Sequence, residues 1–242
     1  MSYVESTKSA LVVSAHSADF VWRCAGAMAL YAKRGYKVTV LCLSYGERGE
    51  SAKLWREKGM TLERVKKNRH EEAHKAAELL GARLVTFDAG DYPMKLTDAH
   101  FERMVDLYRE LRPEFVLTHS LEDPYNRDHP DVARFAQETR ISAQAHGFKP
   151  ETKIIGAPPV FLFEPHQPEQ CGWKPQVYLP IDDVWDLKRK AMECMAAQEH
   201  LWEYYTRVAL QRGVQASRNS DGKIKYAEAY QRIFPQVTDE LA

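Results

Sequence analysis

Histidine and carboxylate side chains gather in two short stretches of this sequence, and these residue types hold divalent metals and move protons. The first stretch is Ala15-His16-Ser17-Ala18-Asp19, where Asp19 alternatively serves only as the N-cap of a following helix. The second lies within residues 119–131 and contains His119, Glu122, Asp123, Asn126, Asp128, His129 and Asp131. Two histidines and a carboxylate, with one position left for water, make a hydrolytic type of zinc site.

A third pattern, His70-Glu71-Glu72-Ala73-His74, fits the H-E-x-x-H signature of zinc proteases. On a helix, the apolar residues of this segment form one stripe, made of Leu62, Val65, Ala73, Ala76 and Leu80. Both histidines fall on the flank of that stripe or on the wet side, so we interpret the segment as a surface helix with chance spacing. Arg69 lies on the inward stripe, where it needs an anion; a bound ligand and a structural salt bridge explain it equally well.

Short apolar runs alternate with helical patterns through the first half of the chain. We expect strands at 10–15, 37–43, 83–87 and 114–118, and a helix that begins at Asp19 and ends at Gly35. This alternation predicts an α/β fold, with a Rossmann-like, mostly parallel sheet flanked by helices. Ligands of such sheets bind beyond the carboxyl ends of the strands. Because the two polar stretches follow the first and fourth strands, we expect them to meet in one crevice.

The second half of the chain is less regular. We expect strands at 160–163 and 176–179, a long helical region over about 183–211, and a surface loop at 217–223. No linker, internal repeat or low-complexity tract interrupts the chain. We therefore expect a single domain over residues 1–242.

The composition excludes several classes of protein. The chain has 34 basic and 34 acidic residues, and 44% of it is hydrophobic, which argues against a disordered chain or a polybasic nucleic-acid binder. No apolar run approaches the ~20 residues of a membrane-spanning helix. The four cysteines are widely spaced and form no C-x-x-C pair. These features predict a reduced, cytoplasmic protein without nucleic-acid or membrane partners.

Taken together, the motifs resemble those of the PIG-L/LmbE-like zinc deacetylase family, over most of the first 135 residues. The resemblance rests on residues 15–19, the Gly46-Glu-Arg-Gly-Glu50 loop, Arg69-x-x-Glu72 and His129-Pro-Asp131. It implies an LmbE-like fold and one zinc ion, for which another divalent ion is an alternative. The metal ligands that it implies are His16, Asp19 and His129.

The sequence departs from the family pattern at the residue that matters most for amide hydrolysis. The family's general base is an aspartate where this chain has Ala18, and an alanine cannot accept a proton. Ser17, Phe20 and Val132 replace the family's proline, glutamate and last histidine. Loss of a general base costs on the order of 10²–10⁴ in rate, so ordinary deacetylation is not expected.

The surroundings of these motifs are similar to those of family members that add water to a carbon–carbon double bond. This likeness implies Glu50 as the base and His166 as the acid, although Glu47 is an equal candidate for the base on its position alone. We expect a tricarboxylate substrate whose carboxylates bind cations drawn from Arg69, Arg48, Arg127 and Lys53. Zinc would activate water or polarise the substrate's oxygens. We also expect a homo-oligomer.

Two other functions stay open. The first is a deacetylase of an N-acetyl sugar or related amide whose base has moved elsewhere, for example to Asp131. The second is a metal-binding relative without catalytic activity, since a decayed enzyme also loses its base.

Overall fold

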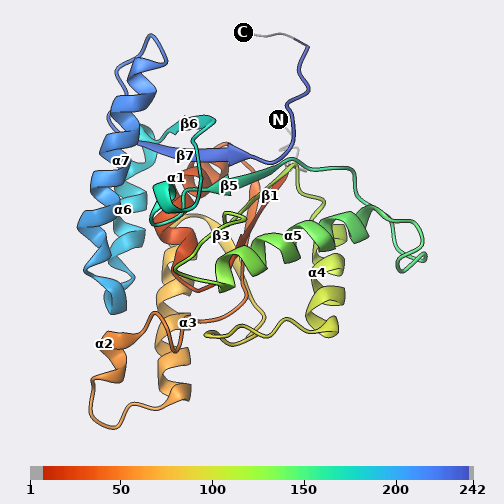
Figure 1. The fold of residues 1–242 in the computed structure, drawn as a ribbon, viewed down its shortest axis with the longest axis horizontal. Coiled ribbons are helices and arrows are strands. Elements are labelled where there is room, and N and C mark those ends of the chain that lie inside the picture. Colours follow the sequence, from red (N-terminus) through yellow and green to blue (C-terminus); the bar gives the residue numbers. More distant parts are fainter. Residues whose placement is uncertain (1–7, 240–242) are drawn as a thin grey trace, which may run out of the picture.

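The computed structural model describes residues 8–239, so both ends of the expected domain, 1–7 and 240–242, lie outside the described residues. Seven strands in this part of the chain form one mixed sheet in the order β3-β2-β1-β4-β5-β7-β6 (Figure 1). Their bounds are β1 (Ser9–Ser14), β2 (Lys37–Cys42), β3 (Ala82–Thr86), β4 (Phe115–Thr118), β5 (Val160–Phe163), β6 (Val177–Pro180) and β7 (Ala227–Arg232). The five strands from β3 to β5 are parallel, whereas β7 runs antiparallel to β5 and β6.

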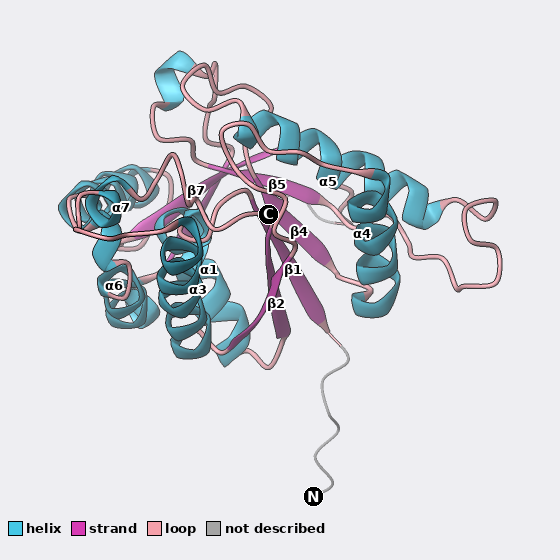
Figure 2. Cartoon of the chain, turned by 90° about the horizontal axis from the view of Figure 1, so that it is seen from below, coloured by secondary structure: helices cyan, strands magenta, loops and turns pink. Residues whose placement is uncertain are grey.

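Helices cover both faces of the sheet. They are α1 (Asp19–Lys33), α2 (Ala52–Trp55), α3 (Leu62–Leu79), α4 (Asp98–Leu111), α5 (Asp128–Gln144), α6 (Trp185–Glu193) and α7 (Leu201–Arg218). Figure 2 shows α1, α3, α6 and α7 on one side of the strands, and α4 and α5 on the other. A hydrophobic core lies on each face of the sheet, and β1 contributes to both. Its Ala10 and Val12 pack on the side of α1, whereas Leu11 and Val13 pack on the side of α4 and α5.

The strand order reverses between β1 and β4. From β1 the chain moves outward to β2 and β3 on one side, and then returns to place β4 on the other side of β1. Loops that follow two such strands diverge and leave a crevice at the carboxyl edge of the sheet. The stretches 15–19 and 119–131 therefore open into the same crevice, as the sequence predicted.

The mostly parallel α/β fold is confirmed, but three details of the second half differ. β7 was not predicted, because its sequence Ala-Glu-Ala-Tyr-Gln-Arg lacks an apolar run. The helical region expected over about 183–211 is present but not continuous: α6 ends at Glu193, a short 3₁₀ turn follows at Ala196–Gln198, and α7 begins at Leu201. The turn is held by α3, since Ala197 donates its N–H to Glu72 and Gln198 accepts from Arg69. The loop expected at 217–223 begins later, because α7 continues to Arg218.

Within the described residues, none of the helices is both long enough and apolar enough to cross a lipid bilayer.

Helix α1, which begins with Asp19, is broken near its middle. Cys24 has φ −144° and ψ 16°, so the backbone groups on either side of it lose their helical partners. The buried carboxylate of Glu228 on β7 accepts the N–H groups of Gly26 and Ala27 at 2.7 and 2.8 Å. Lys188 donates to the orphaned carbonyl of Trp22 at 3.0 Å and to Glu228 at 2.7 Å. This ion pair thus satisfies both ends of the break and fixes the first turns of α1.

We expect Glu228→Gln to destabilise the fold strongly. The change leaves Lys188 without a counter-charge and turns an amide toward two backbone donors, and breaking a buried pair typically costs about 3–5 kcal/mol. The matched control is Glu110→Gln, which breaks an exposed 2.7 Å pair with Arg83 and should cost less than about 1 kcal/mol. Urea unfolding measures both, and equal costs would show that the break needs no buried ion pair.

Candidate metal centre

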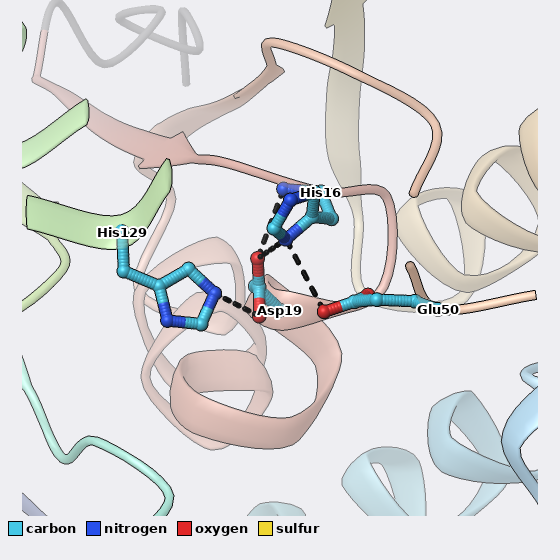
Figure 3. A group of neighbouring side chains, drawn as sticks. All are labelled: His16, Asp19, Glu50 and His129. Carbon is cyan, nitrogen blue, oxygen red and sulfur yellow. Dashed lines mark hydrogen bonds and ion pairs between the residues drawn. The ribbon is translucent and has the colours of Figure 1, made fainter. Parts of the chain in front are cut away.

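Four side chains meet beyond the carboxyl ends of β1, β2 and β4. His16 and Asp19 stand at the turn from β1 into α1, Glu50 in the loop after β2, and His129 in the first turn of α5. Each offers a ligand atom, and these atoms all lie within 4.8 Å of one another (Figure 3). Three of the residues are buried, and the Glu50 side chain is 14% exposed. The donor types and the spacing suit one divalent ion.

The turn after β1 is tied down so that Asp19 faces both histidines. Its Oδ2 accepts the backbone N–H of His16 at 2.9 Å and lies 3.1 Å from the Nδ1 of that residue. Its Oδ1 lies 3.5 Å from Nε2 of His129. Ser14 donates to the carbonyl of His16, and Ser17 donates to the carbonyl of Tyr45, which closes the turn. Asp19 is thus held as a potential ligand and is not merely a helix cap.

A second carboxylate stands behind each histidine. Nε2 of His16 lies 3.2 Å from Asp128, and Nδ1 of His129 lies 2.8 Å from Asp123. Such carboxylates fix the tautomer of a metal-binding histidine and leave its other nitrogen free for the ion. Both aspartates belong to the 119–131 stretch, but the sequence alone assigns them no role; their position beside potential ligands is the signal that identifies them.

The electrostatics of the group favour a cation. Burial lowers the pKa of His16, but Glu50, Asp128 and Asp19 together raise it well above its usual value. Burial raises the pKa of Asp19, but His129 and His119 hold it well below its usual range. The carboxylate therefore stays ionised while His16 retains a proton. A divalent ion would displace that proton, because histidine binds metals in its neutral form.

The structure brings Glu50, and not Glu47, to this group. Oε1 of Glu50 lies 3.2 Å from Nδ1 of His16, and its Oε2 is buried and has no hydrogen-bond partner among residues 8–239. Glu47 is fully buried in another direction, where it accepts from the N–H of Tyr45 and lies 3.8 Å from Lys66. Burial raises the pKa of Glu47. The folded loop thus directs Glu50 toward His16 and Glu47 toward Lys66, although their positions in the sequence made them equal candidates for the base.

His166 lies in the loop after β5, outside the four-residue group. Its ring stacks on Tyr204, and its Nδ1 lies 3.4 Å from the hydroxyl of Tyr205. Burial lowers the pKa of His166, and Arg23 lowers it further. The free protein therefore holds this imidazole neutral.

Arg23 is a buried cation that sequence analysis missed. It donates to the carbonyl of Glu164 at 2.7 Å, and its Nε lies 3.4 Å from Oδ1 of Asp19. It therefore links the turn that holds Asp19 to the loop that holds His166. An arginine within the apolar helix pattern that follows Asp19 is the signal that would have found it.

The four cations proposed for substrate carboxylates occupy very different positions. Arg69 is fully buried and donates to Glu72 at 2.5 Å and to Gln198 at 2.7 Å, so the structure favours the salt-bridge interpretation. Arg127 is 89% exposed and pairs with Asp131 on the outer surface. Arg48 is exposed and donates to the carbonyl of Asp91. Neither Arg69 nor Arg127 is therefore placed to bind a ligand at the metal centre.

Lys53 lies beside the group, in a cleft of about 520 Å³ that Glu50 also lines. It pairs with Glu199 at 3.0 Å on the opposite wall. Arg56 and His200 are further basic side chains of this cleft. The cleft gives a polar ligand access to Glu50.

The histidines of the H-E-x-x-H match are exposed on α3, as their helical phase predicted. Neither belongs to the four-residue group. His119 belongs to the site in another way, because its Nε2 accepts the N–H of Ala15 at 2.9 Å and its ring stacks on His129. It therefore supports the turn and a potential ligand.

The chain is closely similar to hydratases of known name. The chain is 63% identical to a 4-oxalmesaconate hydratase of Pseudomonas putida, over 97% of this chain and 93% of the relative. The crystal structure of GalB, a 4-carboxy-2-hydroxymuconate hydratase from P. putida, superposes with a TM-score of 0.95 at 63% identity and covers 97% of this chain and 100% of that one.

More distant structures share the fold. The N,N'-diacetylchitobiose deacetylase of Pyrococcus horikoshii matches with a TM-score of 0.78 at 19% identity, over 93% of this chain and 84% of that one. The model of the PIG-L family, described as GlcNAc-PI de-N-acetylase, matches residues 11–139, which include His16, Asp19, Glu50 and His129. The chain belongs to the PIG-L family.

Proposed function

We propose that this protein is a metal-dependent hydratase that adds water to 4-oxalomesaconate, or 4-carboxy-2-hydroxymuconate, to give 4-carboxy-4-hydroxy-2-oxoadipate. This reaction belongs to the degradation of gallate and protocatechuate. The observation that carries the proposal is a change in the position of the carboxylate that could act as base. Ala18 occupies the position of the family's aspartate, whereas Glu50, from the loop after β2, contacts His16 of the metal centre. The 63% identity to a named hydratase over 97% of the chain supports this substrate.

His16, Asp19 and His129 would hold the metal, with the fourth member of the group, Glu50, kept free. Two imidazole nitrogens and one carboxylate are a donor set that suits zinc, and another divalent ion is an alternative. The ion would supply a positive charge that stabilises negative charge developing on the substrate's oxygens. The Oε2 of Glu50 has no hydrogen-bond partner within the described residues, which supports an acceptor role toward a water or a substrate atom.

Glu50 would act as the general base. It lines the cleft through which a polar substrate enters, and its Oε1 already touches His16. A base must reach the proton that it accepts within about 2.6–3.2 Å, directly or through one water. Of the two glutamates in this loop, Glu50 is the one that faces the space between His16 and Asp19.

His166 would donate its own proton to the substrate carbon, while Glu50 keeps the proton that it took from water until both exchange with solvent after turnover. Because the free protein holds this imidazole neutral, it must gain its proton when the negatively charged substrate enters. Carboxylates beside Arg23 would offset the positive charge that lowers the pKa of His166. The negative charge of the substrate would thus raise the pKa of His166, so that the imidazole carries the proton that the addition needs.

Asp131, the example of a replacement base for the deacetylase alternative, is not part of the four-residue group. Asp131 lies on the outer surface of α5, where it pairs with Arg127 and Arg134 at 3.4 Å each. A single domain over residues 1–242, a cytoplasmic location and a homo-oligomeric state remain predictions.

An assay of the zinc-loaded protein tests the function. We expect loss of the ultraviolet absorbance of 4-oxalomesaconate, because hydration removes the conjugated double bond, and no release of acetate from N-acetylglucosamine or diacetylchitobiose. Acetate release without hydration would favour the deacetylase, and inactivity on all three compounds would favour the non-catalytic metal protein.

Removal of one ligand should remove the metal. We expect His129→Ala to lose most of its bound zinc and its hydratase activity together, as measured by elemental analysis and by the absorbance assay. The matched control is the double variant His70→Ala and His74→Ala, whose exposed histidines should be dispensable for both. Full zinc retention in His129→Ala, or zinc loss in the control, would reject this ligand assignment.

The two glutamates of one loop form a second matched pair. Glu50→Gln keeps the size of the side chain but removes its basicity, so turnover should fall by at least on the order of 10² while zinc content is unchanged. Glu47→Gln should cost much less activity, because Glu47 faces Lys66 and not the metal centre. The reverse ranking, in zinc-loaded and folded variants, would transfer the role of base to Glu47.

A further inference from the structure

The loop that contains Tyr92 is fastened to both halves of the metal centre. The carboxylate of Asp91 accepts the N–H groups of Arg48 and Gly49, immediately before Glu50. The next N–H, that of Tyr92, donates to Asp128 at 3.2 Å. Asp128 is the carboxylate that stands behind His16. The position of Tyr92 is therefore set by the same contacts that place Glu50 and His16.

Tyr92 adopts a backbone conformation that tyrosine rarely takes. Its φ is +47°, in the left-handed region, which is unfavourable for a bulky side chain and persists only where the surroundings impose it. The ring lies flush on Gly49, where an added Cβ would come within 2.1 Å of a ring carbon. Gly49 thus leaves room for the ring, and the unfavourable backbone directs the ring over the loop that carries Glu50.

The ring of Tyr92 lies beside the metal centre and is partly exposed. Its centroid lies 6.0 Å from that of His16, and the residue is 48% exposed. Within residues 8–239, no side chain or backbone group makes a hydrogen bond with its hydroxyl. Burial and the nearby charge of Glu50 raise the pKa of the phenol to about 12, so the hydroxyl keeps its proton at neutral pH. A protonated hydroxyl without a hydrogen-bond partner in the described residues thus lies near Glu50 and His16.

We propose that the Tyr92 hydroxyl donates a hydrogen bond to an anionic oxygen of the bound substrate, either a carboxylate or the oxygen on which charge develops. The inference rests on the proposed function, because the proposed substrate is an anion that would lie between the cleft and His16. The Tyr92 hydroxyl would supply a neutral donor there, since Arg69 and Arg127 are not available. It also explains why a position next to the base is glycine: any side chain at Gly49 would displace the ring.

Tyr92→Phe tests the contact, since phenylalanine keeps the ring on Gly49 and removes only the hydroxyl. Tyr31→Phe is the matched control, because Tyr31 packs on Tyr36 and Phe115 at the far end of α1. We expect Tyr92→Phe to lower kcat/KM for 4-oxalomesaconate about tenfold or more, as is typical for loss of a hydrogen bond to a charged oxygen, with zinc content unchanged. Tyr31→Phe should be indistinguishable from the parent protein.

Binding of trans-aconitate, an unsaturated tricarboxylate, gives a readout that does not need turnover. If the parent protein fails to hydrate 4-oxalomesaconate, the proposed function is wrong, and calorimetry with trans-aconitate then decides the role of Tyr92. A roughly tenfold weaker affinity in Tyr92→Phe alone supports the contact. Unchanged kcat/KM together with unchanged affinity overturns it, as does a parent protein that neither hydrates the substrate nor binds trans-aconitate.

Discussion

Negative charge concentrated around one buried histidine is the constraint on which this structure depends. Carboxylate oxygens of Asp19 and Glu50 lie within 3.2 Å of Nδ1 of His16, and one of Asp128 lies 3.2 Å from its Nε2. Such a group is stable only with a cation at its centre, and a proton on His16 or a metal ion meets that need. The sheet supplies the geometry, because the reversal of strand order beside β1 brings two loops to one place. The Lys188–Glu228 pair then secures the helix that begins at Asp19.

The same constraint relates this protein to deacetylases of its family and separates it from them. A metal centre built from the turn after β1 and the start of α5 suits both reactions, since each gathers negative charge on oxygen. The difference lies in which segment of the chain carries the general base and from which side that base approaches the metal centre. With Ala18 in the turn, the acceptor that we propose is Glu50 of the loop after β2, which lies beside a cleft that Lys53, Arg56 and His200 also line. These basic side chains are the basis for proposing an anionic substrate there.

Local patterns were sufficient to predict the parallel sheet and the crevice where the two polar stretches meet, whereas the choice of His16, Asp19 and His129 within those stretches came from the family resemblance. Apolar runs mark buried parallel strands, and polar residues just after them mark the ligand-binding edge. Contacts between residues that are far apart in the sequence could not be predicted from local patterns. β7 is polar because Glu228 must reach across to α1, and the break between α6 and α7 depends on Arg69 and Glu72 of α3. The choice of Glu50 came from the family resemblance, since only the folded loop shows which way each glutamate faces.

Anomalous scattering at the zinc edge, measured on a crystal of the zinc-loaded protein, shows whether Glu50 stays free when the metal is bound. We predict one zinc peak, bonded to His16, Asp19 and His129 at about 2.0–2.2 Å, with both oxygens of Glu50 beyond bonding distance and one of them contacting a water. A zinc ion that binds Glu50 as a fourth ligand would contradict the account, because a carboxylate occupied by the metal is not free to accept a proton. A peak located elsewhere in the protein would contradict it as well.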